Sequence, residues 1–158
     1  MSSVATSILA TDFNESTIEQ AKKKQFGSAM VSFRQADAFR VDQIEGVFDG
    51  IFAVDWFAHV PRSRILDFIG SVVARVPSGC PVFFLDQLAG AHSLTGVFDE
   101  EGNHIQERSL SDGSSFRVIK NFFSDEELEG FFSEHEGALE IVRMESCRRI
   151  GVVFRERS

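Results

Sequence analysis

The sequence has few cysteines and lacks the spacings of common metal and disulfide sites. Its two cysteines, Cys80 and Cys147, form no C-x-x-C pair and have no neighbouring histidine pairs. This pattern supports neither a zinc site nor a disulfide framework. The sequence therefore predicts no metal ligands, and a reducing cytoplasm is the natural setting for such a chain.

Long apolar runs are absent as well. No run approaches the roughly 20 residues that a membrane-spanning helix needs. The first ten residues contain neither the basic region nor the long apolar core of a signal peptide. We therefore expect no membrane partner.

Basic clusters are scarce in this acidic chain. Twenty-four acidic and sixteen basic residues give a net charge of −8. The longest basic run, Lys22–Lys24, falls where a helix should end and there complements the helix dipole. An acidic surface repels nucleic acid and anionic membranes, so no nucleic-acid partner is expected. With 43% hydrophobic and 25% charged residues, the 158 residues are typical of one globular domain.

Familiar catalytic motifs are also missing. There is no G-x-S-x-G elbow, H-E-x-x-H pair, P-loop or EF-hand loop. Tyrosine is absent, while 17 phenylalanines indicate a strongly apolar core. The histidines have no ligand spacing, and a lone histidine is usually a surface or internally satisfied residue; the four are His59, His92, His104 and His135.

What the sequence does contain is a set of four apolar runs, each closed by an aspartate. Aspartate is disfavoured inside strands, so these residues suggest the common carboxyl edge of a sheet. In open α/β sheets, ligands bind outside that edge. Aspartate is also a favoured turn and N-cap residue, which gives a purely structural alternative at each junction. The closing residues are Asp12, Asp37, Asp55 and Asp86.

Strands and helices alternate in the first half of the chain. Apolar runs predict strands at 4–12, 31–36, 48–54 and 81–86, with helices at 15–25 and for about 15 residues from Pro61. In the second helix, the i, i+3, i+4, i+7 spacing predicts one buried face, made of Ile65, Phe68, Ile69, Val72 and Val73. This alternation predicts right-handed crossovers in a parallel sheet. Capping boxes are expected at Ser16 with Glu19 and at Ser124 with Glu127.

The second half has a different pattern. Residues 104–110 and 115–121 alternate polar and apolar around a turn signal, as in an exposed antiparallel hairpin. Residues 138–145 and 147–155 are close enough to pair as antiparallel strands. We see no repeat and no second domain.

The first two aspartates form the most specific constellation. A carboxylate at the end of a strand in a nucleotide-binding sheet can accept both ribose hydroxyls, as Asp12 is placed to do. An aspartate at the end of the neighbouring strand, Asp37, lies near the expected position of an adenine. The residues thus suggest a nucleoside site.

Around these residues the chain resembles the class I S-adenosylmethionine-dependent methyltransferases. The order and spacing of the matching segments carry the resemblance, which covers nearly all of the chain. The segments are Ile8–Ser16, Phe33–Ala38, Phe48–Asp49, Trp56, His59–Pro61, Val82–Asp86, Asp112–Gly113, Arg117–Phe122 and Glu126–Leu128.

The resemblance implies an α/β, Rossmann-like methyltransferase sheet, mostly parallel, with antiparallel C-terminal strands and helices on both faces. Residues 1–158 would form a single methyltransferase-like domain, with 87–121 as a lid over the acceptor. The implied cofactor is S-adenosylmethionine, and the implied partner is a small-molecule methyl acceptor.

The resemblance also implies roles for individual residues. Asp12 would bind the ribose, and Asp37 would face the adenine amino group. Asp55 and Trp56 would flank the methionine end. The full cofactor-binding set is Asp12, Phe13, Asp37, Ala38, Phe39, Asp55 and Trp56, and the implied proton acceptors on the acceptor side are His59 and Asp86.

One family feature is not found. A glycine-rich loop is expected roughly 20 residues before Asp12, by analogy with the dinucleotide fingerprint, whereas the sequence begins eleven residues before it. We therefore expect an N-terminally truncated sheet whose open edge pairs with a second copy of the chain. The alternative is a non-catalytic methyltransferase-like interaction module or inactive fragment. A nicotinamide-dependent oxidoreductase shares the ribose carboxylate but finds no support in the later segments.

Overall fold

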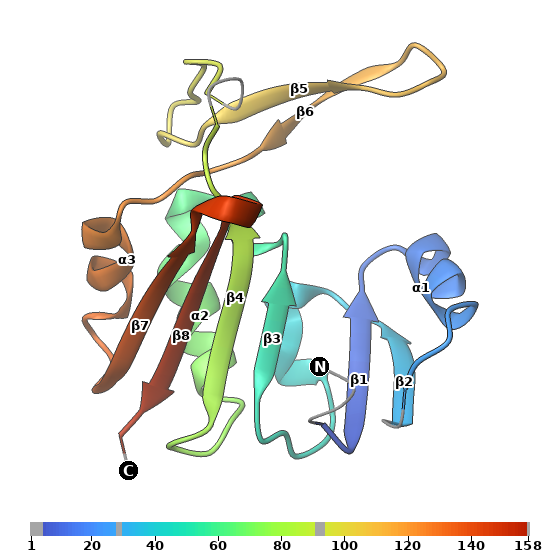
Figure 1. Cartoon of the computed structure of the whole chain (residues 1–158), viewed down its shortest axis with the longest axis vertical. Coiled ribbons are helices and arrows are strands. Elements are labelled where there is room, and N and C mark those ends of the chain that lie inside the picture. Colours follow the sequence, from blue (N-terminus) through green and yellow to red (C-terminus); the bar gives the residue numbers. More distant parts are fainter. Residues whose placement is uncertain (1–4, 28–29, 91–93, 158) are drawn as a thin grey trace. The chain divides into compact units, whose positions relative to one another are not determined.

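The computed structural model of the chain describes residues 5–27, 30–90 and 94–157. The chain forms two compact units, residues 1–46 (unit 1) and residues 47–158 (unit 2). Each unit is described by itself, and Figure 1 labels the elements of both.

Unit 1 is a strand–helix–strand unit followed by a short 3-10 helix. Its elements are β1 (Ser7–Asp12), α1 (Glu15–Lys22), β2 (Met30–Gln35) and η1 (Ala38–Gln43). The two strands pair in parallel, with Asp12 opposite Gln35, as the alternation of elements predicted. The carboxyl ends of both strands therefore lie at one edge.

α1 begins at Glu15, as predicted, but its cap differs from the prediction. The N-cap is Asn14, which has extended backbone angles and makes no side-chain cap bond, so the expected Ser16–Glu19 capping box is wrong. The carboxylate of Asp12 accepts a hydrogen bond from the Asn14 N–H at 2.7 Å, which turns the chain into the helix two residues earlier. Glu19 instead pairs with Lys22, 2.7 Å away at the carboxyl end of the helix.

Unit 2 is built on a four-stranded mixed sheet. Its strands are β3 (Ile51–Val54), β4 (Pro81–Gln87), β8 (Arg149–Glu156) and β7 (Gly137–Met144), in that spatial order. β3 and β4 are parallel, whereas β8 runs antiparallel to β4 and to β7, as predicted for the C-terminal strands. Arg149 lies opposite Gln87, so β8 begins at the carboxyl ends of β3 and β4.

Two α-helices pack together in unit 2, α2 (Ile65–Val73) and α3 (Asp125–Phe132). A 3-10 turn, η2 (Phe57–His59), precedes Pro61. The helix predicted from Pro61 begins as a second 3-10 turn, η3 (Arg62–Arg64), and becomes α-helical at Ile65. The capping box of Ser124 and Glu127 is confirmed in both directions. The predicted apolar face of α2 is also confirmed, because all five of its residues are buried: Ile65, Phe68, Ile69, Val72 and Val73.

The core of unit 2 is a cluster of phenylalanine rings around Phe84, which is 1% exposed. Its ring centroid lies 4.7 Å from that of Phe57, 5.9 Å from that of Phe68 and 6.3 Å from that of Phe132. These rings join β4 to η2, α2 and α3. The many phenylalanines of the sequence thus serve the expected apolar core.

The predicted hairpin forms from β5 (Ile105–Ser109) and β6 (Ser115–Ile119), which pair antiparallel. It projects beyond the carboxyl end of β4 (Figure 1). One further 3-10 turn, η4 (Glu145–Cys147), joins β7 to β8. Within the described part of the chain, no helix is long and apolar enough to cross a membrane.

Candidate functional site

In unit 1, Asp12 is the last residue of β1 and is half-buried. One oxygen of its carboxylate, Oδ1, accepts the Asn14 N–H. Asp12 therefore has the turn-forming role that was the structural alternative to ligand binding. A carboxylate has two oxygens and about four acceptor positions, so the turn leaves acceptor capacity for a ligand.

Asp37 follows β2 at the same edge, two residues beyond the partner of Asp12. It is the N-cap of η1, and its Oδ1 accepts the Phe39 N–H at 2.8 Å. Ala38 and Phe39 open that helix and are half-buried, while Phe13 is 66% exposed beside Asp12. Unit 1 thus brings together the five residues that the sequence assigned to the ribose and adenine.

In unit 2, Asp55 follows β3 in a left-handed backbone conformation with φ of 52°. Its N–H donates to Leu85 O at 2.8 Å, which holds the turn against β4. Its carboxylate accepts a hydrogen bond from Arg149 Nη1 at 2.5 Å. The next residue, Trp56, is half-buried and precedes η2. The ion pair with Arg149 was not foreseen from the sequence.

Asp86 lies near the end of β4 and is 7% exposed. Neither carboxylate oxygen has a hydrogen-bond partner in the described part of the chain. The N–H groups of Phe57 and Ala58 lie near enough to stabilise the charge without reaching hydrogen-bond geometry. Burial raises the pKa of Asp86 to about 6, although the positive charge of Lys120 acts to lower it.

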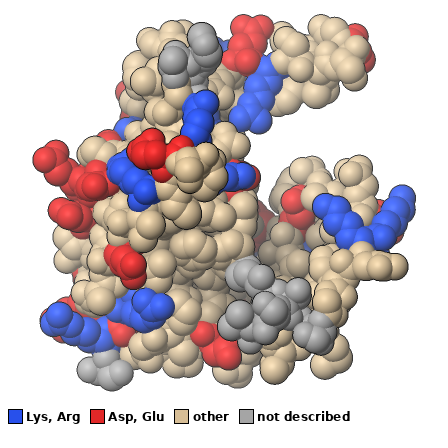
Figure 2. Space-filling view, in the orientation of Figure 1, with Lys and Arg blue, Asp and Glu red and all other residues tan. Residues whose placement is uncertain are grey.

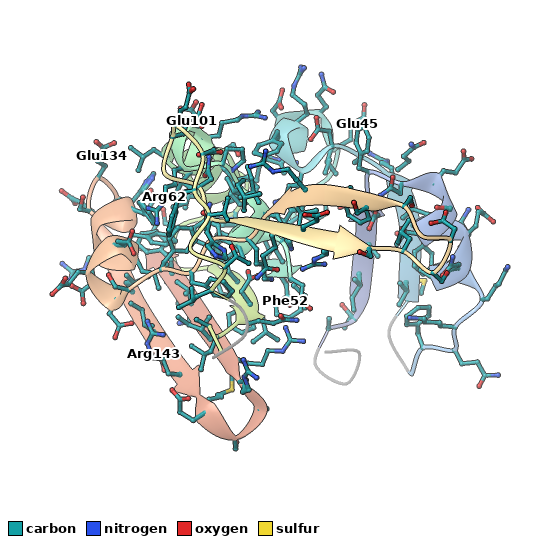
Figure 3. All side chains as sticks on the ribbon, turned by 90° about the horizontal axis from the view of Figure 1, so that it is seen from above. Glu45, Phe52, Arg62, Glu101, Glu134 and Arg143 are labelled. Carbon is teal, nitrogen blue, oxygen red and sulfur yellow. The ribbon has the colours of Figure 1, made fainter. Side chains whose placement is uncertain are left out.

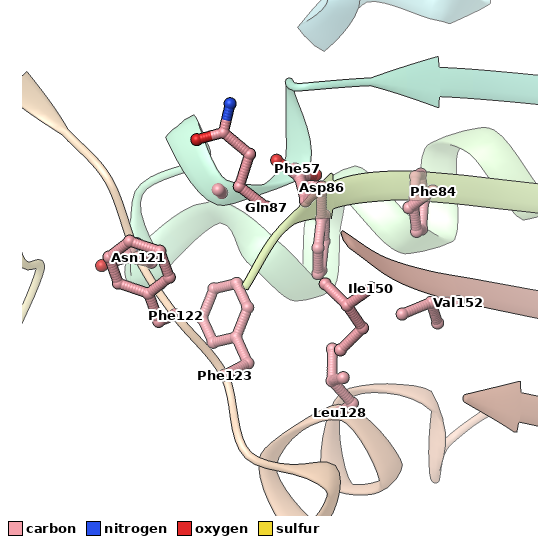
Figure 4. A pocket seen from close by; sticks show the side chains of 11 residues that line it. Phe57, Phe84, Asp86, Gln87, Asn121, Phe122, Phe123, Leu128, Ile150 and Val152 are labelled. Atoms are coloured by element: carbon pink, nitrogen blue, oxygen red, sulfur yellow. The ribbon is translucent and has the colours of Figure 1, made fainter. Parts of the chain in front are cut away.

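A small cavity of about 20 Å³ borders Asp86 (Figure 4). This is room for one water molecule and not for a substrate. Its wall includes Gln87, Phe122 and Phe123, which also line a larger groove of about 280 Å³. The groove continues along Leu88, Leu94, Ser124, Arg143 and Ile150. The two spaces therefore adjoin.

His59 ends η2 and is half-buried. Its Nδ1 lies 2.5 Å from the carbonyl oxygen of Ile119, so Nδ1 carries the proton and Nε2 is the acceptor. Burial and the charge of Lys120 lower the pKa of His59, which keeps the ring neutral near pH 7. His59 and Asp86 thus both offer a proton-accepting group.

A buried polar network at the base of the β5–β6 hairpin was not recognised from the sequence. Asn121 donates to Val60 O and to Asn103 Oδ1, both at 3.1 Å, and its Oδ1 accepts the His104 N–H at 2.9 Å. The His104 ring is internally satisfied, with Nδ1 bound to Lys120 O and Nε2 accepting the Thr95 N–H. The quoted segment Arg117–Phe122 contains two of these residues, but no local pattern distinguished them.

The same network reaches η3. Asn103 Oδ1 accepts the Arg62 N–H at 2.7 Å, and the Arg62 side chain donates to Gly102 O and pairs with Glu127 at 2.8 Å. Ser63 donates to Glu101 on the same loop, whose position beside Arg62 is visible in Figure 3. The hairpin base is therefore fixed to the segment that carries His59.

Surface charge is mixed on the face shown in Figure 2, where lysines and arginines lie in small groups beside acidic residues. Four of the described cations are tied to carboxylates by ion pairs of 2.8 Å or less, namely Lys22, Arg62, Arg143 and Arg149. Among the described residues, no group of His, Cys, Asp and Glu is arranged to hold a metal ion.

Comparison with known proteins gives consistent results. Residues 1–75 match the model of a methyltransferase domain. The structure of DhpI in complex with SAH is 28% identical, with a TM-score of 0.75, and the match covers 99% of this chain and 69% of that one. DhpI in complex with SAM and HEP is 29% identical, with a TM-score of 0.78 over 98% of this chain and 70% of that one.

A SAM-dependent methyltransferase from Methanosarcina mazei has the same fold at 14% identity, with a TM-score of 0.68 over 99% of this chain and 84% of that one. No curated protein sequence matches. The family match and the SAM- and SAH-bound structures agree with the predicted α/β, Rossmann-like methyltransferase fold. These findings support a SAM-dependent methyltransferase whose cofactor is S-adenosylmethionine.

Proposed function

We propose that unit 1 binds the adenosine half of S-adenosylmethionine through Asp12 and Asp37. One observation carries this assignment. Each carboxylate uses one oxygen to accept a backbone N–H within its own turn, which fixes its direction. The remaining oxygen suits the vicinal ribose hydroxyls at Asp12 and the adenine amino group at Asp37. Phe13, Ala38 and Phe39 supply apolar surface for the base.

The acceptor that we propose is a small molecule. Its supports are the net charge of −8, which disfavours nucleic acid, and the modest groove of about 280 Å³ in unit 2. The groove is lined by apolar side chains and by the polar side chains of Gln87, Ser124 and Arg143. We propose residues 87–121 as the lid of this acceptor region within a single methyltransferase domain.

S-adenosylmethionine supplies a methyl group that transfers by direct displacement, so positioning the acceptor provides much of the catalysis. Where the acceptor must lose a proton, Asp86 and Nε2 of His59 are the groups we assign to take it. A pKa of about 6 makes Asp86 ionised at neutral pH and still a useful base. The adjoining one-water cavity gives Asp86 a route to an acceptor in the groove. We assign Asp55 and Trp56 to the methionine end of the cofactor.

Two further expectations stay as proposals. Pairing of two chains through an open sheet edge is supported by β3, whose outer edge has no partner among the described strands. A reducing cytoplasmic location is supported by Cys80 and Cys147, which are both free. Light scattering on the purified chain tests the dimer directly.

Calorimetric titration with S-adenosylmethionine and S-adenosylhomocysteine tests the assigned cofactor site. We expect micromolar binding by the unchanged chain. Asp12→Ala removes a charged hydrogen-bond acceptor for the ribose and is expected to weaken binding by roughly tenfold to a hundredfold, because such bonds contribute about 1.5–3 kcal/mol. Asp12→Asn retains an oxygen for the Asn14 turn and separates loss of charge from loss of the turn.

Asp42→Ala is the matched control, because Asp42 is an exposed carboxylate of unit 1 whose pair with Arg40 spans 3.6 Å. It is expected to bind both ligands like the unchanged chain. Equal binding by Asp12→Ala and the unchanged chain would rule out Asp12 as the ribose ligand.

A further inference from the structure

One buried cation in unit 2 has no part in the function proposed above. Lys120 directly follows β6 and is 2% exposed. Its Nζ lies 3.9 Å from Oδ1 of Asp86. Lysine is almost never buried this deeply without a partner. Asp86 is the acidic partner that the structure gives it.

The main chain around Lys120 is fixed to the base of the hairpin. The Lys120 N–H donates to His104 O at 2.8 Å, and Lys120 O accepts from His104 Nδ1 at 2.9 Å. The following residue, Asn121, donates its N–H to Ala58 O at 2.7 Å and its side-chain amide to Val60 O. The ammonium group is therefore held at Asp86 by the seating of the hairpin on residues 58–60.

Other charged or titratable groups from neighbouring elements also face this pair. They are Asp55 after β3, His59 of η2, Arg108 of β5 and Arg149 of β8. Asp55 disfavours the charge of Asp86, but it is itself bound to Arg149, so these two groups largely offset each other. Arg108 acts against the charge of Lys120, and His59 is neutral. Lys120 remains the main counter-charge of Asp86.

We propose that Lys120 is a positioning residue through which the β5–β6 hairpin keeps the Asp86 carboxylate ionised. The proposal rests on the assigned role of Asp86 as proton acceptor. With the hairpin seated, the ammonium stabilises the carboxylate at neutral pH. Without the ammonium beside it, a carboxyl group buried among Phe57, Phe84 and Ile150 takes up a proton and no longer accepts one. The lid thus activates the base as it covers the acceptor region.

The direct test is the titration of Asp86, followed by carboxyl ¹³C NMR on the full chain from about pH 4 to about pH 9. The unchanged chain should titrate at about 6. Lys120→Met should raise this midpoint by roughly one to three pH units, the usual effect of losing an opposite charge at this distance. Lys120→Arg should keep it near that of the unchanged chain. Lys22→Met, which breaks only the exposed pair with Glu19, should leave it unchanged.

A second measurement needs no substitution, since removing one partner of a buried pair can unfold a protein. Amide hydrogen exchange is followed in the unchanged chain as the pH falls from about 7.5 to about 5. After correction for the intrinsic exchange rate, protection of the Lys120 and Asn121 amides should fall together with protonation of Asp86. Protection of the Val153 amide in β8 should not.

An unchanged Asp86 midpoint in a folded Lys120→Met chain overturns the proposal. Protection of the Lys120 and Asn121 amides that stays constant as Asp86 is protonated overturns it as well. Neither readout uses the cofactor or an acceptor. If the assigned ribose site is wrong, only the binding experiment with the Asp12 variants shows it. If Lys120 does not control the ionisation of Asp86, only the two measurements described here show it.

Discussion

Replacement of Phe84 by alanine is expected to cost unit 2 about 3–5 kcal/mol of unfolding free energy. The side chain is 1% exposed, and its ring touches rings from three other elements. Because Phe57, Phe68 and Phe132 are each fixed in a separate helix or turn, they have little freedom to close the resulting cavity. The loss is a large share of the stability of about 5–15 kcal/mol that is typical of a domain.

Urea unfolding followed by the fluorescence of Trp56 measures this cost. Trp56 is the only tryptophan in the sequence and belongs to unit 2, so its signal reports that unit. The matched control is Phe116→Ala on β6, where the ring is 43% exposed and the expected change is within about 0.5 kcal/mol. A cost for Phe84→Ala below about 1 kcal/mol would contradict its place at the centre of the core.

Asn121→Ala is expected to cost about 3 kcal/mol and to loosen the β5–β6 hairpin. The substitution leaves two buried polar groups without their partner, the carbonyl of Val60 and the N–H of His104, and removes one of the bonds of Asn103 Oδ1. Each orphaned group costs about 1–3 kcal/mol, although Asn103 Oδ1 keeps its bond to the Arg62 N–H. These bonds join the hairpin base to residues 58–62, so their loss acts on the hairpin first.

The same fluorescence assay gives the global cost, and amide exchange at Ile105 and Ile119 gives the local one. Gln87→Ala is the control, because Gln87 carries an exposed amide at the end of β4 and is expected to change stability by about 0.5 kcal/mol or less. Exchange at the hairpin that is as slow in Asn121→Ala as in the unchanged chain would show that other contacts hold the lid.

The sequence predicted the features that local patterns encode. The 3.6-residue spacing from Ile65 to Val73 identified the buried face of α2, and Ser124 with Glu127 identified the start of α3. The hairpin was predicted by its turn and its alternation. The Ser16–Glu19 prediction failed because the competing interaction comes from a strand residue, Asp12, whose side chain caps the turn before Asn14.

The polar interior of unit 2 could not be predicted in this way. Lys120 pairs with Asp86 from 34 positions away, and Arg149 pairs with Asp55 from 94 positions away. Such pairs depend on how β8 and the hairpin return to the carboxyl ends of β3 and β4. Hydrophobic periodicity carries no signal for them. The sequence thus predicted which carboxylates stand at the carboxyl ends of the strands, but not the residues that set their electrostatics.

The left-handed turn at Asp55 has a consequence for which residues position 55 tolerates. Glycine adopts a φ of 52° without strain, whereas most L-residues pay about 1–2 kcal/mol there. We expect Asp55→Gly to change the stability of unit 2 by less than about 1 kcal/mol, since backbone relief offsets the lost pair with Arg149. Asp55→Asn keeps the turn and loses only the charge.

Trp56 fluorescence in urea checks the stability, and the NMR signal of the Arg149 guanidinium reports its release. A loss above about 2 kcal/mol in Asp55→Gly would mean that the ion pair holds the turn. A smaller loss would mean that the backbone conformation at position 55 favours glycine. The aspartate would then be present for the interactions of its carboxylate and not for stability.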